Sequence, residues 1–244
     1  MRLFGLIGYP LTHSFSKKYF DEKFIREAHN DCLFENFPLA TIHELPHLLE
    51  IHPNLHGFAV TIPHKKHVVQ YLDESDDAVK ATGACNCVVR RNGKMLGYNT
   101  DIAGFEFSFS KRLGPNHHRA LVLGTGGGAE AVAFVLRKKG IPFEFVSRRR
   151  SKDARFSYDD LDAAVMQEHP VIINCTPLGT YPDVEGSPPI PYQYLSSDHY
   201  LFDLVYNPEK TRFLREGEER GAITCNGYEM LVGQAEENWK IWNQ

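Results

Sequence analysis

Four side chains that can exchange protons stand together in the segment FAVTIPHKKHVV, residues 58–69: His64, Lys65, Lys66 and His67. If Pro63 begins a helix, where its missing N–H is not needed, that helix runs to Leu72. Helical phase then places Lys65 on the apolar stripe and turns Lys66 toward solvent. Because a lysine that faces inward needs a partner, Lys65 is predicted to be either a tuned acid–base group or half of a structural ion pair.

Three other segments carry polar groups that a small polar substrate would need. The candidate partner of Lys65 is Asp101 in NTDIAGF, although this carboxylate could equally cap the helix that follows. Ser14 and Ser16 lie where a predicted strand gives way to a helix, which suits carboxylate binding or, alternatively, helix capping. Gln234 shares an apolar helical stripe with Trp242, and an inward amide needs a partner such as a polyhydroxylated ligand.

A glycine-rich turn separates an apolar strand from a helix in RALVLGTGGGAEAVAFVLRKKG, residues 119–140. Gly124 permits the tight turn, Gly126 lets the backbone approach a pyrophosphate, and Ala129 allows close helix–strand packing. The N-terminus of the helix then faces the phosphates. The context therefore predicts a dinucleotide site, with a purely structural glycine turn as the alternative.

The next predicted strand, residues 141–147, indicates which dinucleotide is bound. An NAD-binding fold usually presents a carboxylate about 20 residues beyond the glycines. This sequence instead offers one hydroxyl and three guanidinium groups there: Ser147, Arg148, Arg149 and Arg150. Guanidinium groups bind a 2′-phosphate in a bidentate way, so we predict NADP as the cofactor; a solvated basic turn is the alternative.

The composition limits the possible partners. The chain has 244 residues, of which 42% are apolar, and a formal net charge of -4, so it has no net attraction for nucleic acid or anionic membranes. We see neither a run of about 18 apolar residues nor a signal peptide, which favours a cytoplasmic protein without membrane contact. The five cysteines are odd in number and scattered, as in a reducing compartment, and the histidine pairs at four-residue spacing lack further ligands, so no metal is expected.

Two α/β halves succeed one another along the chain. Short apolar runs alternate with helical stretches in both, and the second half opens with the glycine-rich turn. We predict an α/β fold with two domains: an N-terminal α/β substrate-binding domain, residues 1–104 plus 226–244, and a Rossmann-like doubly wound NADP-binding domain, residues 105–225. The oligomeric state, monomer or homodimer, is not readable from the sequence.

Eight motifs in the same order resemble those of the shikimate dehydrogenase family over almost the whole chain. The segments are HSFS, VTIPHK, GACN and NTDIAGF in the first half, and GTGGGA, SRR, DLVYNPEKT and GYEMLVGQA in the second. The resemblance implies reversible reduction of 3-dehydroshikimate to shikimate with NADPH, on the route to chorismate and the aromatic amino acids.

The resemblance also implies a role for each matching residue. Lys65 and Asp101 would manage the proton beside the reduced carbonyl, without deciding which of them exchanges it. The residues implied to bind substrate are Ser14, Ser16, Thr61, Asn86, Tyr206 and Gln234. Those implied to bind the cofactor are Gly124, Gly126, Gly127, Gly128, Ser147, Arg148 and Arg149, with Thr176, Leu204 and Gly227 nearer the nicotinamide.

Four departures from the family pattern leave the exact polyol acid open. Ala59 replaces the usual asparagine, Lys17 a proline, Phe20 and Asp21 a His-Asn pair, and Ser147 and Arg149 the flanks of Asn-Arg-Thr. Because Ala59 and Lys17 border the implied substrate site, a relative that acts on quinate, or a weakly active NADP-binding paralogue, is the alternative within the family. From other classes, the alternatives are a silent NADP-binding sensor and a metal-dependent hydrolase.

Overall fold

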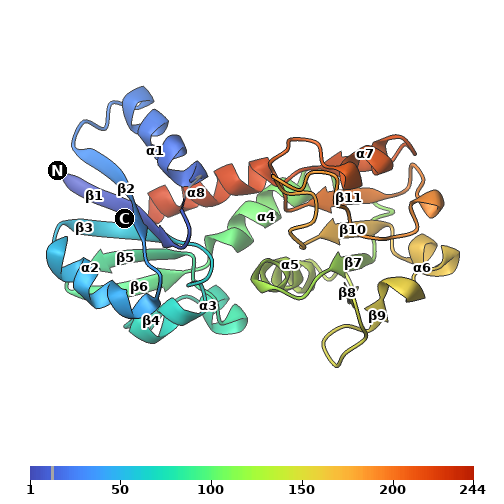
Figure 1. The fold of residues 1–244 in the computed structure, drawn as a ribbon, viewed down its shortest axis with the longest axis horizontal. Coiled ribbons are helices and arrows are strands. Elements are labelled where there is room, and N and C mark those ends of the chain that lie inside the picture. Colours follow the sequence, from blue (N-terminus) through green and yellow to red (C-terminus); the bar gives the residue numbers. More distant parts are fainter. Residues whose placement is uncertain (12–13) are drawn as a thin grey trace. The chain divides into compact units, whose positions relative to one another are not determined.

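The computed structural model describes residues 1–11 and 14–244, which form two compact units (Figure 1). Unit 1 comprises Met1–Thr100 and Ala235–Gln244, and unit 2 comprises Asp101–Gln234. The predicted α/β fold with two domains is confirmed, and each unit contains one six-stranded, parallel-rich sheet. His13, the first residue of the HSFS motif, lies outside the described residues.

Unit 1 is built on a six-stranded mixed sheet in the order β2-β1-β3-β5-β6-β4. Its strands are β1 (Arg2–Gly8), β2 (Cys32–Pro38), β3 (Leu55–Val60), β4 (Glu74–Ser75), β5 (Cys87–Arg91) and β6 (Lys94–Tyr98). Its helices are α1 (Phe15–Arg26), α2 (Leu45–Ile51) and α3 (Asp77–Thr82), with 3₁₀ turns η1 (Ile42–Glu44) and η2 (His67–Tyr71). β1 pairs in parallel with β2 and β3, whereas β5 runs antiparallel to β3 and β6. A two-residue turn at Asn92 and Gly93, both with positive φ, closes the β5–β6 hairpin.

Both faces of the unit 1 sheet are buried, because alternate residues of each strand point to opposite sides. In β3, Phe58 belongs to the aliphatic cluster on one face. Its neighbour Ala59 belongs to the aromatic cluster on the other, together with Phe4, Phe20 and Trp242. Because both faces are packed, side chains that could contact a ligand must lie at the edges of this sheet, where its strands end.

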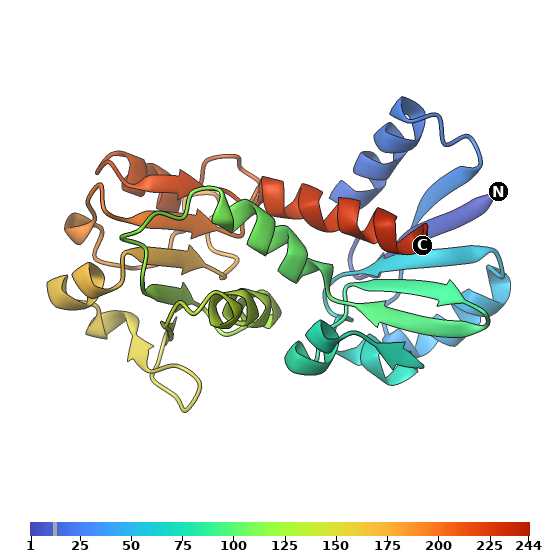
Figure 2. The same ribbon diagram turned by 180° about the vertical axis from the view of Figure 1, so that it is seen from behind.

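The last residues of the chain complete unit 1. Trp242 at the end of α8 (Tyr228–Trp242) is 3% exposed, stacks on Phe4 and donates its indole N–H to Val88 O at 3.0 Å. A Cβ at Gly57 would lie 2.4 Å from the Trp242 ring, so the glycine makes room for it. Figure 2 shows this C-terminus beside the strands of unit 1.

Unit 2 is a doubly wound parallel sheet. Its strands are β7 (Ala120–Leu123), β8 (Phe143–Ser147), β9 (Phe156–Ser157), β10 (Val171–Asn174), β11 (Tyr200–Asp203) and β12 (Ile223–Cys225). Its helices are α4 (Thr100–Ser110), α5 (Gly127–Lys138), α6 (Ala163–Glu168) and α7 (Arg212–Glu218), with 3₁₀ turns η3 (Tyr158–Asp160) and η4 (Tyr192–Tyr194). The order β9-β8-β7-β10-β11-β12 is that of dinucleotide-binding folds, with its switch point between β7 and β10. Nucleotides bind at the carboxyl ends of such strands, so this edge positions the cofactor site.

The helix predicted from Pro63 to Leu72 is wrong. The Ile62–Pro63 peptide bond is cis, the chain turns through residues 62–66, and only the 3₁₀ helix η2 follows. Tertiary hydrogen bonds replace the helical ones: Lys65 O accepts from the Cys85 N–H at 2.8 Å. Sequence periodicity does not report such competition from a backbone N–H twenty residues away.

Candidate active site

The predicted substrate-side residues of unit 1 gather at one edge of its sheet. Ser14 follows the carboxyl end of β1, and Thr61 and Lys65 follow that of β3. Asn86 immediately precedes β5, whose antiparallel course brings its start to the same edge, and Val60 N–H donates to Asn86 O at 2.9 Å. Five residues from three distant segments, Ser14, Ser16, Thr61, Lys65 and Asn86, thus lie along a single edge.

The two serines open helix α1. Ser14 is its N-cap, because Ser14 Oγ accepts from the Lys17 N–H at 3.2 Å, so the capping alternative is real. Capping uses the oxygen as an acceptor and leaves the hydroxyl hydrogen able to donate to a carboxylate. Ser16 is 8% exposed. The Lys17 ammonium donates to Phe34 O at 2.6 Å and lies 3.2 Å from an Asp21 carboxylate oxygen, so its charge is neutralised locally.

The lysine segment is held by its backbone and by a buried histidine. Thr61 N–H donates to Ile7 O at 2.9 Å. His64 is 2% exposed and its Nε2 lies 2.7 Å from Leu39 O, which requires the hydrogen on that nitrogen. Lys65 is half-buried and Lys66 exposed, as predicted, although the tight turn rather than a helix produces this difference.

Asn86 is a buried organiser of the same edge. It is 2% exposed, and its Oδ1 accepts from the Thr100 N–H at 2.7 Å, capping the start of α4 from a distant segment. Thr100 Oγ1 in turn lies 2.6 Å from Asn238 Oδ1. Sequence reasoning missed Asn238, which carries no local signal beyond its place on an inward helical face. Asp101, the first residue of unit 2, is half-buried; its pairing with Lys65 of unit 1 stays a prediction.

Two of the departures from the family pattern lie in the same buried cluster. Ala59 is 3% exposed and Phe20 is fully buried, and both belong to the same aromatic cluster. Two positions that are polar in the family pattern are thus both apolar here, within one cluster.

The glycine-rich turn lies between β7 and α5 at the switch point of unit 2. Gly124 has φ +98°, a conformation that L side chains rarely adopt. Gly126 and Gly127 are exposed, have no positive φ, and would carry a Cβ that meets nothing within 4 Å. A Cβ at Gly128 would lie 2.9 Å from Leu204 Cδ2. Packing within the chain therefore does not demand glycine at 126 or 127, whereas a phosphate approaching the backbone would.

The basic segment follows the carboxyl end of β8. Ser147 is half-buried and its hydroxyl donates to Arg149 O at 2.5 Å. Arg150 makes a two-pronged ion pair with Asp160 and is thereby engaged. Arg148 and Arg149 are exposed. The guanidinium groups of Arg148 and Arg149 are thus exposed to solvent, whereas that of Arg150 is held in an ion pair within the fold.

The predicted nicotinamide-side residues follow β10, β11 and β12. Thr176 is tied to Asn174, because its N–H and its hydroxyl both donate to Asn174 Oδ1, at 3.0 and 2.6 Å. Leu204 is half-buried, and a Cβ at Gly227 would lie 2.2 Å from Leu204 O, so only glycine fits there. Sequence reasoning missed Asn174 and the fully buried Asp203, which lie side by side in the β10–β11 register.

Two predicted substrate residues belong to unit 2. Burial raises the pKa of the Tyr206 hydroxyl, so it stays protonated and can donate a hydrogen bond. Gln234 on α8 is 8% exposed, as its inward helical position predicts. A Cβ at Gly104 of α4 would lie 3.0 Å from Gln234 N, so the two helices approach closely.

Within residues 1–11 and 14–244, no three His, Cys, Asp or Glu side chains form a group that could hold a metal ion. Over the same residues, none of the helices combines the length and apolar character needed to cross a bilayer.

Comparison with known proteins places these features in a family. A family model described as the shikimate dehydrogenase substrate binding domain matches residues 6–88. A curated shikimate dehydrogenase (NADP(+)) from Dehalococcoides mccartyi is 36% identical over 98% of this chain and 90% of its own length. The crystal structure of Thermus thermophilus shikimate 5-dehydrogenase with NADP(H) and shikimate superposes with a TM-score of 0.87 at 28% identity, covering 99% of this chain and 93% of that one. Ligand-free 5-ketofructose reductase from a Gluconobacter strain gives 0.85 at 27%, with 99% and 92% covered.

The fold and the residues at its edges define a class of protein. A Rossmann sheet with a glycine-rich first turn and two exposed arginines after its second strand, in one chain with a second α/β unit, is typical of an NADP-dependent oxidoreductase. The chain belongs to the shikimate dehydrogenase family. The predicted resemblance, reaction class and cofactor agree with the curated relatives, which are NADP(+)-dependent shikimate dehydrogenases.

Proposed function

We propose that this protein catalyses the reversible NADPH-dependent reduction of 3-dehydroshikimate to shikimate, a step toward chorismate and the aromatic amino acids. One observation carries the proposal. Five polar side chains from three segments, predicted from family motifs, line one edge of the unit 1 sheet. The glycine-rich turn of unit 2 adds support, because its backbone at Gly126 and Gly127 is not covered by other parts of the chain. A protein that only bound NADP would not need the five polar side chains at the edge of unit 1.

The substrate would be held by donors at its carboxylate and by amides and hydroxyls at its ring. Ser14 and Ser16 supply hydroxyl donors, with Tyr206 contributing, and its raised pKa keeps that phenol a donor. The side chains for the ring hydroxyls are Thr61, Asn86 and Gln234.

NADPH supplies the hydride when it is bound, and the chain's own residues manage the proton. A half-buried lysine beside a carboxylate can hold or exchange a proton at the carbonyl oxygen, and positioned proton transfer contributes about 10²–10⁴-fold to rate. We assign this work to Lys65 and Asp101 together.

The cofactor site would combine phosphate-binding backbone with a basic end. Gly124, Gly126, Gly127 and Gly128 approach the diphosphate at the N-terminus of α5, and Ser147, Arg148 and Arg149 bind the 2′-phosphate. Thr176, Leu204 and Gly227 would lie beside the nicotinamide. The corresponding functional domains are residues 1–104 plus 226–244 for substrate and 105–225 for NADP.

We further propose a cytoplasmic location and a monomer or homodimer. The five cysteines are all free, as in a reducing compartment. Light scattering on the purified chain distinguishes one copy from two.

An NADP-coupled assay on shikimate tests the function, with Lys65→Ala as the decisive variant. The kcat of the variant should fall about 10²–10⁴-fold with a smaller change in KM for NADP+. Lys66→Ala, next in sequence but exposed, is the matched control and should retain wild-type rates. Full activity of the Lys65 variant would overturn the assigned role.

The same assay separates the alternatives. A higher kcat/KM on quinate than on shikimate would reassign the substrate within the family. NADP binding without turnover of either acid would favour the sensor, and loss of activity with a chelator would favour the hydrolase.

A further inference from the structure

A buried carboxylate behind the predicted nicotinamide side is not used by the chemistry described above. Asp203, at the carboxyl end of β11, has no exposed surface. Its Oδ1 accepts from Asn174 Nδ2 at 2.9 Å and from the Val205 N–H at 3.0 Å, and its Oδ2 accepts from Thr211 Oγ1 at 2.6 Å. All three donors are neutral. Burial raises the pKa of this carboxyl to about 6, so it is ionised at neutral pH and accepts hydrogen bonds only.

This acceptor fixes the orientation of the Asn174 side chain. The amide has one donating and one accepting end, and its Nδ2 must point to Asp203. Its Oδ1 is therefore turned toward Thr176, from which it accepts both the N–H and the hydroxyl hydrogen. A flipped amide would set its NH2 group against the Thr176 N–H and its oxygen against the Asp203 carboxylate.

The orientation of Asn174 in turn fixes the polarity of Thr176. The only hydrogen of Thr176 Oγ1 is committed to Asn174 at 2.6 Å, and the Leu178 N–H approaches the same oxygen at 3.3 Å. The hydroxyl is left with acceptor capacity alone. A donor on the ligand, but not a further acceptor, can bind it.

We propose that Asp203 is a positioning residue of the cofactor site: acting through Asn174, it holds the Thr176 hydroxyl as an acceptor for the carboxamide N–H of the nicotinamide ring. The inference rests on the proposed function, because that function places Thr176 beside the nicotinamide. We call the hydrogen-bonded series Asp203–Asn174–Thr176 the relay. Thr211 is not part of it, because it binds the other carboxylate oxygen of Asp203 and caps α7.

The test compares NADP+ with its 3-acetylpyridine analogue, which keeps the ring carbonyl but lacks the N–H donor. Thr176→Val and Asn174→Leu should each raise the KM and Kd for NADP+ about tenfold, the effect of one lost hydrogen bond. With the analogue, wild type and both variants should differ less than twofold, because the bond is absent throughout. Calorimetric Kd values give a readout that does not depend on turnover.

Two further variants separate positioning from simple loosening of the fold. Thr211→Val removes one hydrogen bond of Asp203 outside the relay, so it should lower the melting temperature and leave the KM for NADP+ unchanged. The exchange Asn174→Asp with Asp203→Asn reverses the hydrogen bond between these two residues but keeps an acceptor facing Thr176, at the cost of the bond from the Val205 N–H, and should restore the KM toward the wild-type value.

The outcomes are distinct. Three results would each overturn the positioning role. The first is that Thr176→Val and Asn174→Leu lose as much affinity for the analogue as for NADP+. The second is that Thr211→Val raises the KM for NADP+ as much as they do, and the third is that both of them keep the wild-type KM. If wild-type protein binds NADP+ yet leaves shikimate unchanged, the proposed function fails, whereas the relay is still judged by the Kd comparison.

Discussion

Gly126 and Gly127 are exposed residues whose identity the chain itself does not explain. Neither has a positive φ, and a Cβ on either would enter open space. Glycine costs backbone entropy on folding, so its presence at the start of a helix implies a compensating use. Close approach of a diphosphate to the backbone is such a use.

Gly127→Ala should therefore separate stability from binding. Alanine suits the first turn of α5 and restricts the unfolded chain, so the free energy of unfolding should be unchanged or rise by about 0.4–1 kcal/mol. The KM for NADP+ should rise at least about tenfold, because the added methyl group occupies the phosphate approach. Urea unfolding and steady-state kinetics measure the two effects. An unchanged KM would mean that the phosphates lie elsewhere, and the KM for shikimate serves as the internal control.

At the scale of elements, strand ends decide which side chains are available. The carboxyl end of β8 presents three successive arginines, but Asp160 of η3 engages only Arg150. Sequence alone could not rank the three, since the partner lies ten residues away in an irregular segment.

The double substitution Arg148→Ala, Arg149→Ala should shift the cofactor preference. Loss of two guanidinium groups from a 2′-phosphate site should lower kcat/KM for NADP+ about 10²-fold and leave the low rate with NAD+ unchanged. Arg150→Ala is the control: it breaks only a solvent-screened surface ion pair with Asp160 and should keep the NADP preference. Equal losses with both cofactors would contradict 2′-phosphate recognition.

The elements that were predicted correctly are those with local signals. The β7–α5 turn and the end of β8 at Ser147 follow from residues within a few positions of one another. The lysine segment failed because the Cys85 N–H, twenty residues away, takes the Lys65 carbonyl. Asn174, Asp203 and Asn238 escaped notice for the same reason, since their partners are set by the register of strands and helices.

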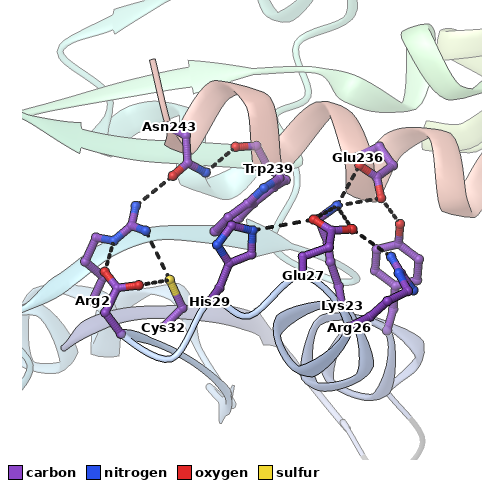
Figure 3. Close-up of polar contacts among 11 residues, drawn as sticks. Arg2, Lys23, Arg26, Glu27, His29, Cys32, Glu236, Trp239 and Asn243 are labelled. Atoms are coloured by element: carbon purple, nitrogen blue, oxygen red, sulfur yellow. Dashed lines mark hydrogen bonds and ion pairs between the residues drawn. The ribbon is translucent and has the colours of Figure 1, made fainter.

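The contact between α1 and the end of α8 depends on an ionic network (Figure 3). Lys23 is 3% exposed, and its ammonium lies 2.9 Å from Glu27 and 3.0 Å from Glu236. Tyr19 donates a short hydrogen bond to the same Glu236. Removing one partner of a buried charge destabilises a protein more than breaking a surface ion pair does. We therefore expect this network to hold the end of α8 against α1.

Acidification should weaken that network. Hydrogen bonds from Lys23 and then Arg26 lower the pKa of Glu27 from 4.5 to about 2. A lowered folded-state pKa gives stability that is complete above the unfolded value of about 4.5 and is lost as the pH falls toward about 2. Glu27→Gln should therefore be less stable than wild type near neutral pH and equal to it near pH 2, as thermal unfolding across that range can show. If the difference in stability between Glu27→Gln and the wild type did not depend on pH, Glu27 would be excluded as the titrating group.

At the scale of the whole molecule, unit 1 is discontinuous in sequence. Met1–Thr100 supplies the sheet, and Ala235–Gln244 supplies the aromatic side chains that close one of its faces. The stability of the substrate-side edge therefore depends on residues that are remote from it in the chain.

Trp242→Ala should destabilise unit 1 by about 3–5 kcal/mol, the cost of removing a large buried side chain. Trp239→Ala, on the same helix but only partly buried, should cost clearly less and is the matched control. Urea unfolding measures both. Equal effects would contradict the central place given to Trp242 between Phe4 and Gly57.

The return of residues 235–244 to unit 1 also sets an order of events during synthesis. A ribosome delivers the first hundred residues long before Trp242 exists, so the aromatic cluster on one face of the nascent sheet, with Phe4 and Phe34, stays incomplete and open to water or to chaperones. Unit 2 is contiguous, and all its residues have been made by the time Gln234 is added. The half of the molecule that is translated first is the half that matures last.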